Sequence, residues 1–385
     1  MSDKKTINAV TTPLALGDQG RDAPQVLIKE CLGIAGLTTR CGSRGFKDAP
    51  PETEHSAIVA HLLAQGAAIT GTVTMHELAF GVTGVNTFAG TALNPNWPDR
   101  IPGGSSSGSA SAVAAGLCDF AVGTDTGGSV RQPACCCGVY GLKPTYGAID
   151  RRGAIPRGSS LDVIGPFAAS AEALTRAASM MLPSFTPAEI TAPKLKRISV
   201  EADADITATL DKALAGYDVP NVTLSSFKAS YEAGLTVINY ELASEFGQLA
   251  RSDASLGVDV KGRIQAALSV TPEALAEAET VRAVFTREVD AALEGVDALV
   301  LPTMPCVPPT LAAATDPRAL LPLTRLVRPF NLSGHPALTL PLTTREGLPA
   351  GLQLVGRKGA EATLCAIAEH LSRALAARSM PEMLS

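Results

Sequence analysis

Two short runs of glycine and serine contain the residue types in this chain that are best suited to chemistry. The first covers residues 103–109 (GGSSSGS) and the second covers residues 123–129 (GTDTGGS). Each run places serine hydroxyls among glycines, where backbone N–H groups can approach a small reacting group closely. The first run leads into an alanine-rich segment at 109–116 that is predicted to be helical, so its N–H groups lie at the positive end of a helix dipole. This arrangement suits a phosphate or a developing oxyanion.

Three known motifs match parts of these runs, and each lacks a component. The first run does not end in Gly-Lys-Ser/Thr, so a nucleotide P-loop lacks its phosphate-binding lysine. Residues 104–108 match G-x-S-x-G, the nucleophile elbow of α/β hydrolases, which needs a later histidine. Only His335 and His370 follow late enough, and His370 falls in a regular helix where packing is the better interpretation. Residues 125–127 (DTG) copy the aspartic-protease triplet, but that chemistry needs two such carboxylates and the chain has one copy.

A serine nucleophile without a histidine needs another base, and a buried lysine can act as one. Burial disfavours the ammonium form and so lowers the pKa of the amine. Lys29 ends the apolar run 25–28 and is the candidate, whereas Lys47 lies in a polar loop. A lysine at the end of a strand is also commonly an ordinary surface residue, so on spacing alone both interpretations stay open.

The composition is that of a globular chain without signals for nucleic acid or membrane. Of its 385 residues, 46% are hydrophobic and 18% are charged, which supplies a large core and argues against disorder. Aromatic residues are scarce at 4% and the net charge is −5, so a nucleic-acid partner is not expected. The start of the chain has no signal-peptide core, and no apolar run is long enough to span a membrane. We therefore expect a cytoplasmic protein.

The cysteines and histidines show no metal-binding pattern. The eight cysteines include no C-x-x-C pair with a matching partner, and the five histidines show no paired metal-ligand spacing. Residues 135–137 (CCC) are expected to pack as small apolar side chains behind the second run. His55 and His61 are expected to face solvent on a helix, and His76 is expected to form a buried hydrogen-bonded pair with Glu77. The sequence predicts no metal site and no cofactor.

Alternating strand and helix patterns are expected to position the two runs. Strands are predicted at 25–28, 67–73, 119–123, 197–200, 221–224, 298–301, 337–340 and 351–355, and helices at 54–65, 109–116, 172–181, 204–215, 230–250, 272–293 and 360–377. The strand at 119–123 delivers the second run at its C-terminal end, where ligands gather in α/β sheets. The middle of the chain, about 168–290, is expected to supply pocket walls at most. With no repeat and no convincing linker, one elaborated α/β domain is the simplest account.

These patterns resemble the amidase signature family, which hydrolyses amides with a Ser–cis-Ser–Lys triad. The resemblance extends over nearly the whole chain from about residue 24 and is weakest across 185–290. The matching segments are 27–30 (LIKE), 33–39 (GIAGLTT), 75–81 (MHELAFG), 103–109, 123–131, 138–145 (GVYGLKPT), 160–166 (SLDVIGP), 328–334 (RPFNLSG) and 351–356 (GLQLVG). Within the family the chain is most similar to compact amidases of the indole-acetamide hydrolase type, although that similarity is loose and the substrate does not transfer.

The resemblance implies a role for several residues. Lys29 is the expected base, Ser105 the bridging serine after a cis Gly–Ser peptide, and Ser129 the nucleophile. The other implied roles are an oxyanion hole made by the backbone N–H groups of Thr126, Gly127, Gly128 and Ser129, a loop-holding ion pair between Asp125 and Arg131, an assisting role for Ser106, and a wall of the acyl pocket at Ala79. For Ser106, Ser107 and Ser109 we favour the alternative of helix capping and loop hydrogen bonding.

The resemblance also implies the fold and the activity. The expected fold is a single amidase signature domain over 1–385, with a large mixed, twisted sheet covered by helices on both faces. Its catalytic core is expected at about 24–170 and 296–378, and a variable, substrate-side region at about 185–290. The implied activity is hydrolysis of a small-molecule carboxylic amide, without cofactor, nucleic acid or membrane, with a homodimer as a candidate assembly.

Two other functions are consistent with parts of this pattern. One is an amidotransferase subunit that releases ammonia from glutamine for a partner enzyme acting on charged tRNA. The other is a non-catalytic amidase-like binding protein. Binding proteins of that kind lose triad residues, whereas Lys29, Ser105 and Ser129 are all present here.

Overall fold

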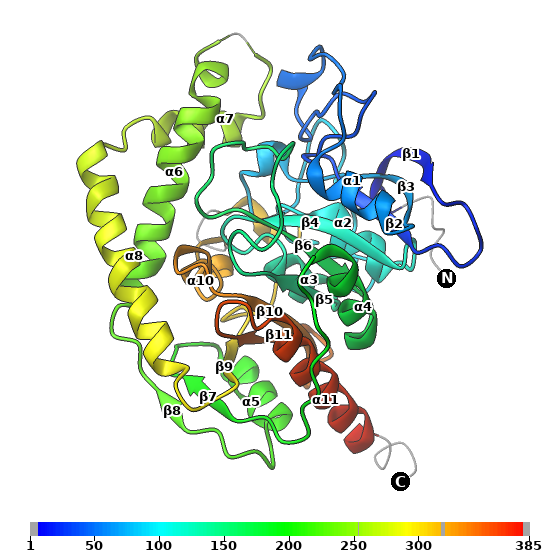
Figure 1. Cartoon of the computed structure of the whole chain (residues 1–385). Coiled ribbons are helices and arrows are strands. Elements are labelled where there is room, and N and C mark those ends of the chain that lie inside the picture. Colours follow the sequence, from blue (N-terminus) through cyan, green and yellow to red (C-terminus); the bar gives the residue numbers. More distant parts are fainter. Residues whose placement is uncertain (1–6, 253, 317–319, 380–385) are drawn as a thin grey trace.

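An eleven-stranded mixed β-sheet forms the centre of the computed structural model, which describes residues 7–252, 254–316 and 320–379 (Figure 1). The strands, in their order across the sheet, are β1 (Val10–Gly17), β3 (Ala68–Val73), β2 (Gln25–Lys29), β4 (Phe120–Asp125), β6 (Val163–Ala168), β5 (Tyr140–Lys143), β10 (Ala337–Thr343), β11 (Pro349–Val355), β9 (Ala298–Pro302), β7 (Leu195–Ile198) and β8 (Asn221–Val222). β2 runs parallel to both β3 and β4. The carboxyl ends of β2 and β4 therefore lie side by side at one edge of the sheet.

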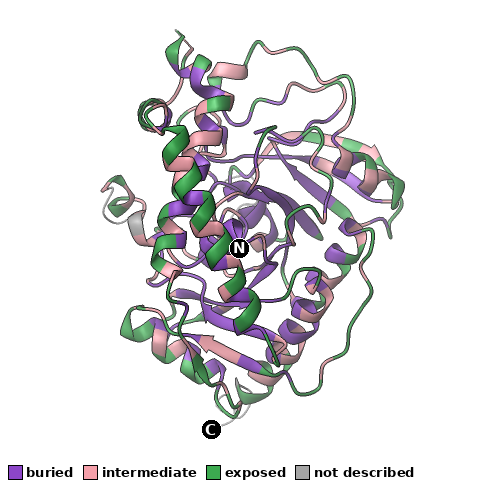
Figure 2. Ribbon diagram, turned by 60° about the vertical axis from the view of Figure 1, so that its left-hand side comes forward, coloured by how far each residue is buried: buried purple, intermediate pink, exposed green. Residues whose placement is uncertain are grey.

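Helices cover both faces of this sheet. They are α1 (Ala57–Ala64), α2 (Ser107–Ala114), α3 (Arg131–Cys137), α4 (Ala171–Met181), α5 (Ala204–Ala213), α6 (Phe227–Arg251), α7 (Val258–Ala267), α8 (Pro272–Ala292), α10 (Pro329–Leu332) and α11 (Glu361–Ser379). Side chains alternate along β2 as a strand buried on both faces requires. Leu27 packs with α2 and α3, whereas Val26 and Ile28 pack in the larger cluster with α1, α4 and α11. Figure 2 shows the buried residues concentrated on the strands and on the inward sides of the helices.

The predicted fold class is confirmed, with several corrections to individual elements. The helix predicted at 109–116 begins earlier, at Ser107, and the strand predicted at 197–200 lies at Leu195–Ile198. Residues 135–137 are completely buried, as expected, but they form the end of a helix, α3, that the sequence did not predict. A segment containing Pro133 and three cysteines has no amphipathic period to identify it. The strands β1, β5 and β6 and the helix α7 were also missed.

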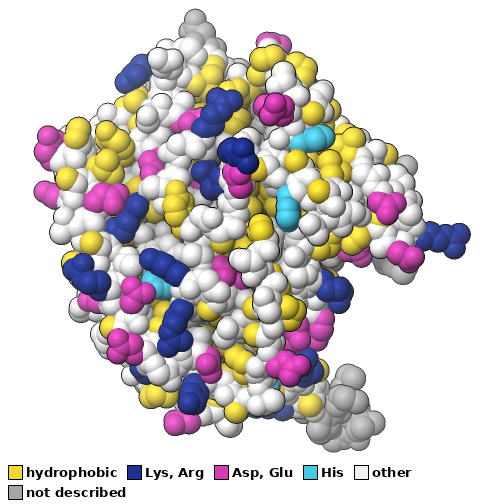
Figure 3. Space-filling model, viewed as in Figure 1, with side chains coloured by type: hydrophobic (Ala, Val, Ile, Leu, Met, Phe, Trp, Pro, Cys, Tyr) yellow, Lys and Arg dark blue, Asp and Glu magenta, His cyan; other side chains and the backbone are white. Residues whose placement is uncertain are grey.

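The face of the molecule seen in Figure 3 shows no concentration of one charge. Lysine and arginine side chains are interspersed with aspartate and glutamate on the side seen in Figure 3. Among the described residues, no helix is both long enough and apolar enough to cross a membrane.

Candidate active site

Lys29, the last residue of β2, is completely buried. Its Nζ lies 2.7 Å from Ser105 Oγ and 2.8 Å from Thr124 Oγ1. Burial lowers the pKa of Lys29 from its ordinary value, and the neighbouring Cys31 and Asp162 oppose this only in part. The lysine therefore holds its proton less tightly than an exposed lysine does, as a general base must. The structure therefore excludes the interpretation of Lys29 as an ordinary surface residue, and its role as a base stays a prediction.

The loop that carries Ser105 to Lys29 is tightly packed at Gly104, where a side chain would not fit. The peptide bond between Gly104 and Ser105 is cis. The Gly104 N–H group donates to Gln132 Oε1 at 2.9 Å, a contact that no sequence motif indicated. A Cβ atom at position 104 would lie 2.9 Å from the carbonyl oxygen of Gly81, so glycine is required there. Ser105 itself is 1% exposed.

Ser129 lies at the end of the turn that follows β4. The residue is half-buried, and its Oγ has no hydrogen-bond partner among the described residues. Gly128 has a φ of +120°, which side-chain-bearing residues rarely adopt, and its N–H group donates to Asp125 Oδ1 at 2.7 Å. This donor therefore helps to fix the turn, and a contribution of Gly128 to an oxyanion hole stays a prediction. Within the described ranges, the N–H groups of Thr126, Gly127 and Ser129 have no acceptor and stay available to a ligand.

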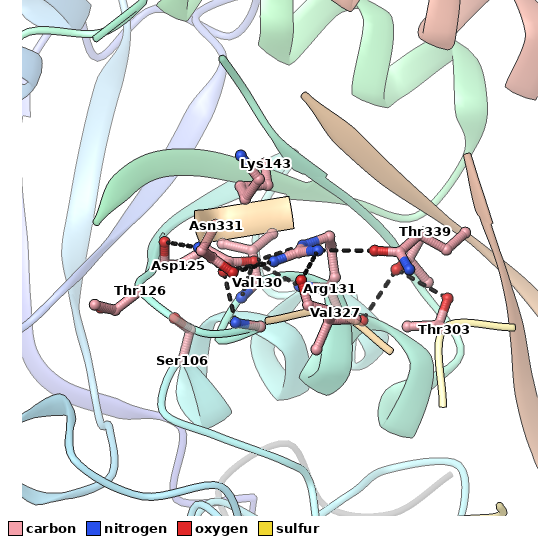
Figure 4. Close-up of polar contacts among 12 residues, drawn as sticks. Ser106, Asp125, Thr126, Val130, Arg131, Lys143, Thr303, Val327, Asn331 and Thr339 are labelled. Carbon is pink, nitrogen blue, oxygen red and sulfur yellow. Dashed lines mark hydrogen bonds and ion pairs between the residues drawn. The ribbon is translucent and has the colours of Figure 1, made fainter. Parts of the chain in front are cut away.

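Asp125 and Arg131 form a completely buried ion pair behind this turn (Figure 4). Two parallel contacts of 2.9 Å join Nε to Oδ2 and Nη2 to Oδ1. Arg131 also donates to the Val327 carbonyl and Gln353 Oε1, both at 2.7 Å, and to Asn331 Oδ1 at 2.6 Å. Burial alone would raise the pKa of Asp125, but the Arg131 guanidinium holds it well below its usual range. These contacts agree with the predicted role of the pair in holding the loop.

A second ion pair near the turn was missed by the sequence analysis. Asp162 is buried and accepts from Arg151 Nη2 at 2.7 Å and from Arg151 Nε at 3.1 Å. Its other carboxylate oxygen accepts from Thr126 Oγ1 at 2.9 Å. The side chain of Thr126 is therefore anchored, which fixes the backbone on the far side of the turn from Gly128. The sequence signal for Asp162 was its place in the family segment 160–166.

Two serines of the first run, Ser106 and Ser109, form hydrogen bonds that connect the start of α2 to β4. Ser106 Oγ donates to the Thr124 carbonyl at 3.1 Å and accepts from the Thr124 N–H group at 3.3 Å. Ser109 Oγ donates to the Val122 carbonyl at 3.1 Å. α2 has no side-chain cap, so the helix-capping part of our favoured interpretation is wrong. Ser106 instead orients the end of β4, where Thr124 contacts Lys29.

The late histidines do not complete a Ser–His pair with the first run. His335 Nδ1 lies 3.0 Å from Ser333 Oγ, and its Nε2 lies 2.9 Å from Asp290 Oδ1. Burial lowers the pKa of His335 to about 4. His370 packs edge-on against the ring of Tyr217. Neither histidine contacts a serine of residues 103–109, so the nucleophile-elbow interpretation lacks its base.

Three expectations for the early histidines need correction. His76 is buried, but its nearest ionic partner is Asp259 at 3.6 Å rather than Glu77. His55 and His61 are half-buried rather than solvent-facing. His55 Nδ1 accepts from the backbone N–H of residue 35, and His61 Nε2 lies 2.9 Å from the carbonyl of residue 180. Across the ranges that the structure describes, no group of three or more His, Cys, Asp or Glu side chains could hold a metal ion.

A cavity of about 510 Å³ opens beside the turn and provides room for a ligand. Thr324 and Arg328 line it, and both approach the turn. A Cβ atom at Gly127 would lie 3.4 Å from Arg328 Nε, and one at Gly128 would lie 3.7 Å from Thr324 Cγ2. Ala79, the expected wall of the acyl pocket, does not line this cavity; it is half-buried against the main core. Its contact with an acyl group stays a prediction.

Comparisons with known proteins define the class to which this fold and site belong. The Amidase family model matches residues 25–223 and 253–365. The chain is 32% identical to Amidase 1 of Oryza sativa subsp. japonica, over 90% of this chain and 89% of that protein. It is also 32% identical to a glutamyl-tRNA(Gln) amidotransferase subunit from Synechococcus sp. (strain RCC307), over 90% of this chain and 82% of that protein. A crystal structure of an amidase matches with a TM-score of 0.82 at 30% identity, over 91% of this chain and 84% of that one.

The class is thus that of the amidase signature hydrolases. Three features of the structure are consistent with it: the mixed sheet, the cis Gly104–Ser105 peptide and the buried Lys29–Ser105 contact. The chain belongs to the amidase family.

Proposed function

We propose that this protein hydrolyses a small-molecule carboxylic amide to a carboxylic acid and ammonia or an amine, through an acyl-enzyme on Ser129. The observation that carries this proposal is the completely buried Lys29, whose Nζ lies 2.7 Å from Ser105 Oγ. A buried amine in contact with a serine hydroxyl is the arrangement that a proton relay without histidine requires. Ser129 is half-buried on the neighbouring turn, in which Gly127 and Gly128 approach Arg328 and Thr324 of the cavity lining.

The proposed reaction begins with proton transfer along the three residues. Ser129 Oγ attacks the amide carbonyl carbon while its proton passes to Ser105, whose own proton passes to neutral Lys29. The carbonyl electron pair moves onto oxygen, where the N–H groups of Thr126 and Gly127 stabilise the charge. Collapse of this intermediate breaks the C–N bond, and the relay returns a proton to the leaving nitrogen. Water then attacks the acyl ester by the same relay and releases the acid.

Residues from the middle of the chain form one side of the cavity, which supports the proposal that the region at about 185–290 sets substrate choice. Tyr231 and Leu235 of α6 line the cavity, and so do Asp259 and Arg263 of α7. The residues that would perform the chemistry come from other elements, the ends of β2 and β4 and the loops that follow them. The division into a catalytic core and a substrate-side region is thus consistent with where the side chains lie.

The proposal is tested by replacing the nucleophile and the base and measuring ammonia or amine release from aliphatic, aryl and ureido amides. Ser129→Ala is expected to lower kcat on the order of 10⁴-fold or more, because no other hydroxyl is placed to form the acyl-enzyme. Lys29→Met is expected to cost about 10²–10⁴-fold, the contribution of a general base. Ser107→Ala is the matched control, since Ser107 Oγ is buried and makes no hydrogen bond to any described residue. Undiminished activity in Ser129→Ala would show that the assignment is wrong.

A second candidate function is the ammonia-releasing subunit of an amidotransferase. The similarity to the glutamyl-tRNA(Gln) amidotransferase subunit from Synechococcus, at 32% identity over 90% of this chain, favours it. In that case glutamine would be the amide, and partner subunits would raise the rate of its hydrolysis. A glutaminase assay of the chain alone and with candidate partners separates the two functions. Efficient hydrolysis of simple amides without any partner supports the small-molecule amidase.

A further inference from the structure

Arg328 is buried without the partners that a buried guanidinium needs. It is 8% exposed, and Nη2 donates to Thr324 Oγ1 at 2.9 Å. Its face lies 4.3 Å from the centre of the Tyr231 ring. Nε and Nη1 are buried and have no hydrogen-bond partner among the residues that the structure describes. An arginine stays charged in proteins, so burying these donors without partners costs free energy.

The carboxylates that share the cavity with Arg328 are engaged elsewhere. Glu77 accepts from Ser43 Oγ at 2.6 Å and from the Gly257 N–H group at 2.8 Å. Asp259 lies 3.6 Å from the His76 ring. The remaining charged residue of the lining is another cation, on α7. Arg328 therefore has no carboxylate partner within the described part of the chain, although it faces a cavity large enough to hold one.

Two glycines, Gly234 and Gly127, leave the space that the Arg328 side chain occupies. A Cβ atom at Gly234 of α6 would lie 3.0 Å from Arg328 Cγ and 3.1 Å from Cδ, so any larger residue would displace the stem of the side chain. A Cβ atom at Gly127 would lie 3.4 Å from Arg328 Nε. The contact with Gly127 also shows where the Nε donor of Arg328 lies. Nε is next to the turn whose N–H groups would hold the carbonyl oxygen of the scissile amide.

We propose that Arg328 binds a carboxylate of the substrate, so that the enzyme acts on amides that carry an acid group a few bonds from the scissile carbonyl. The planar guanidinium matches the two oxygens of a carboxylate, and hydrogen bonds between charged groups are the stronger kind. A bound carboxylate would pair the buried charge and fill the free donors. This inference rests on the proposed amide hydrolysis and names its substrate class. Arg328 would act in binding and specificity, without taking part in proton transfer.

The test compares acid monoamides with neutral amides of the same chain length. The acid set is malonamic, succinamic and glutaramic acid together with glutamine, and the neutral set lacks the carboxylate. The wild-type enzyme is expected to prefer at least one acid amide, and Arg328→Met to lower the acid-to-neutral ratio of kcat/KM about 10²–10³-fold, mostly through KM. Arg325→Met is the matched control, because Arg325 is three residues away, donates to the Glu201 carbonyl and does not line the cavity. A wild-type enzyme without preference for the acid set, and a ratio unchanged in Arg328→Met, would overturn the inference.

A binding experiment tests the carboxylate site independently of whether the protein hydrolyses amides. Calorimetric titration of succinamic, malonamic and glutaramic acid into Ser129→Ala measures binding without turnover. Binding that is lost in Ser129→Ala/Arg328→Met and kept in Ser129→Ala/Arg325→Met supports the carboxylate site even if no amide is hydrolysed. Absence of binding to Ser129→Ala, or equal binding to all three proteins, overturns it.

Thermal unfolding distinguishes this role from a structural one. An arginine that holds the fold together should lower the melting temperature when it is replaced. Arg328→Met removes a buried charge without breaking an ion pair, so we expect a melting temperature equal to or above that of the wild type. Addition of succinamic acid should raise the melting temperature of the wild type and of Arg325→Met, but not that of Arg328→Met. A lowered melting temperature in Arg328→Met without this loss of ligand response would assign the residue to structure.

Discussion

Two buried arginines lie close to the turn at residues 126–129, and they differ in how far their donors are satisfied. Arg131 has Asp125 as an ion-pair partner and donates further to three residues that are distant in the sequence. Arg328 is buried almost as deeply, yet its Nε and Nη1 have no hydrogen-bond partner within the described ranges, and it faces a cavity. Fully paired charges fix a structure, whereas unpaired buried donors destabilise it unless a ligand completes them. The pairing of Arg131 therefore suits a residue that holds the turn, whereas the unpaired donors of Arg328 suit a residue that binds the substrate.

The largest expected effect comes from Asp125→Ala, which would leave Arg131 buried without an ion-pair partner, as Arg328 is within the described part of the chain. Removing one partner of a buried ion pair leaves an uncompensated charge, so we expect the free energy of unfolding to fall by about 3–5 kcal/mol. Urea unfolding followed by circular dichroism measures this. Arg328→Met is the control in the same assay, because it removes a buried arginine that has no ion-pair partner. Equal stability of Asp125→Ala and the wild type would remove the distinction between the two arginines.

The comparison extends to the two buried lysines of the site, which differ in what they contact. Lys29 lies against Ser105, whereas Lys143 Nζ donates to the Pro144 carbonyl and burial lowers its pKa to about 7. Protonated Lys29 cannot accept a proton, so kcat/KM should fall about tenfold per pH unit as the pH drops below the lowered pKa of Lys29. Lys143→Met should keep the midpoint of this fall, since Lys143 is outside the relay. Activity that stays constant down to pH 5 would exclude a neutral lysine as the base.

The smallest of these effects is expected at Gly128, in the turn between the two arginines. A Cβ atom there would lie 2.3 Å from Val327 Cγ2, and the φ of +120° is strained for alanine. Gly128→Ala should lower stability by about 1–3 kcal/mol and reduce kcat, because the N–H groups of the turn shift. Gly127→Ala is the matched comparison, with ordinary φ and a closest contact of 3.1 Å. If Gly128→Ala proved no worse than Gly127→Ala, the turn would be more adaptable than the structure indicates.

Much of the framework of the site could be predicted because it depends on local pattern. Apolar runs that end in a polar residue identified β2 with Lys29 and β4 with the second glycine–serine run. Both strands are buried and parallel neighbours, so their carboxyl ends had to meet at one edge. The resemblance to a family then supplied the roles that spacing alone left open.

The remainder could not be predicted because it depends on contacts between distant segments. The Gly128 N–H group is taken by Asp125, and the sequence does not show which donors a nearby side chain will occupy. Thr126 is anchored by Asp162, which lies 36 positions further along the chain. Arg328 appeared in a family segment, but only the structure shows that two of its nitrogens are buried without a hydrogen-bond partner in the part of the chain that it describes.

The central claim is that Ser129 is the nucleophile and forms an acyl-enzyme. Rapid acid quenching during turnover of an activated aryl ester or amide, followed by peptide mass spectrometry, locates the acyl group directly. The account predicts an adduct on Ser129 in the wild-type protein and no adduct in Ser129→Ala. An acyl group on Ser105 or Ser106, or an adduct that persists in Ser129→Ala, would contradict it.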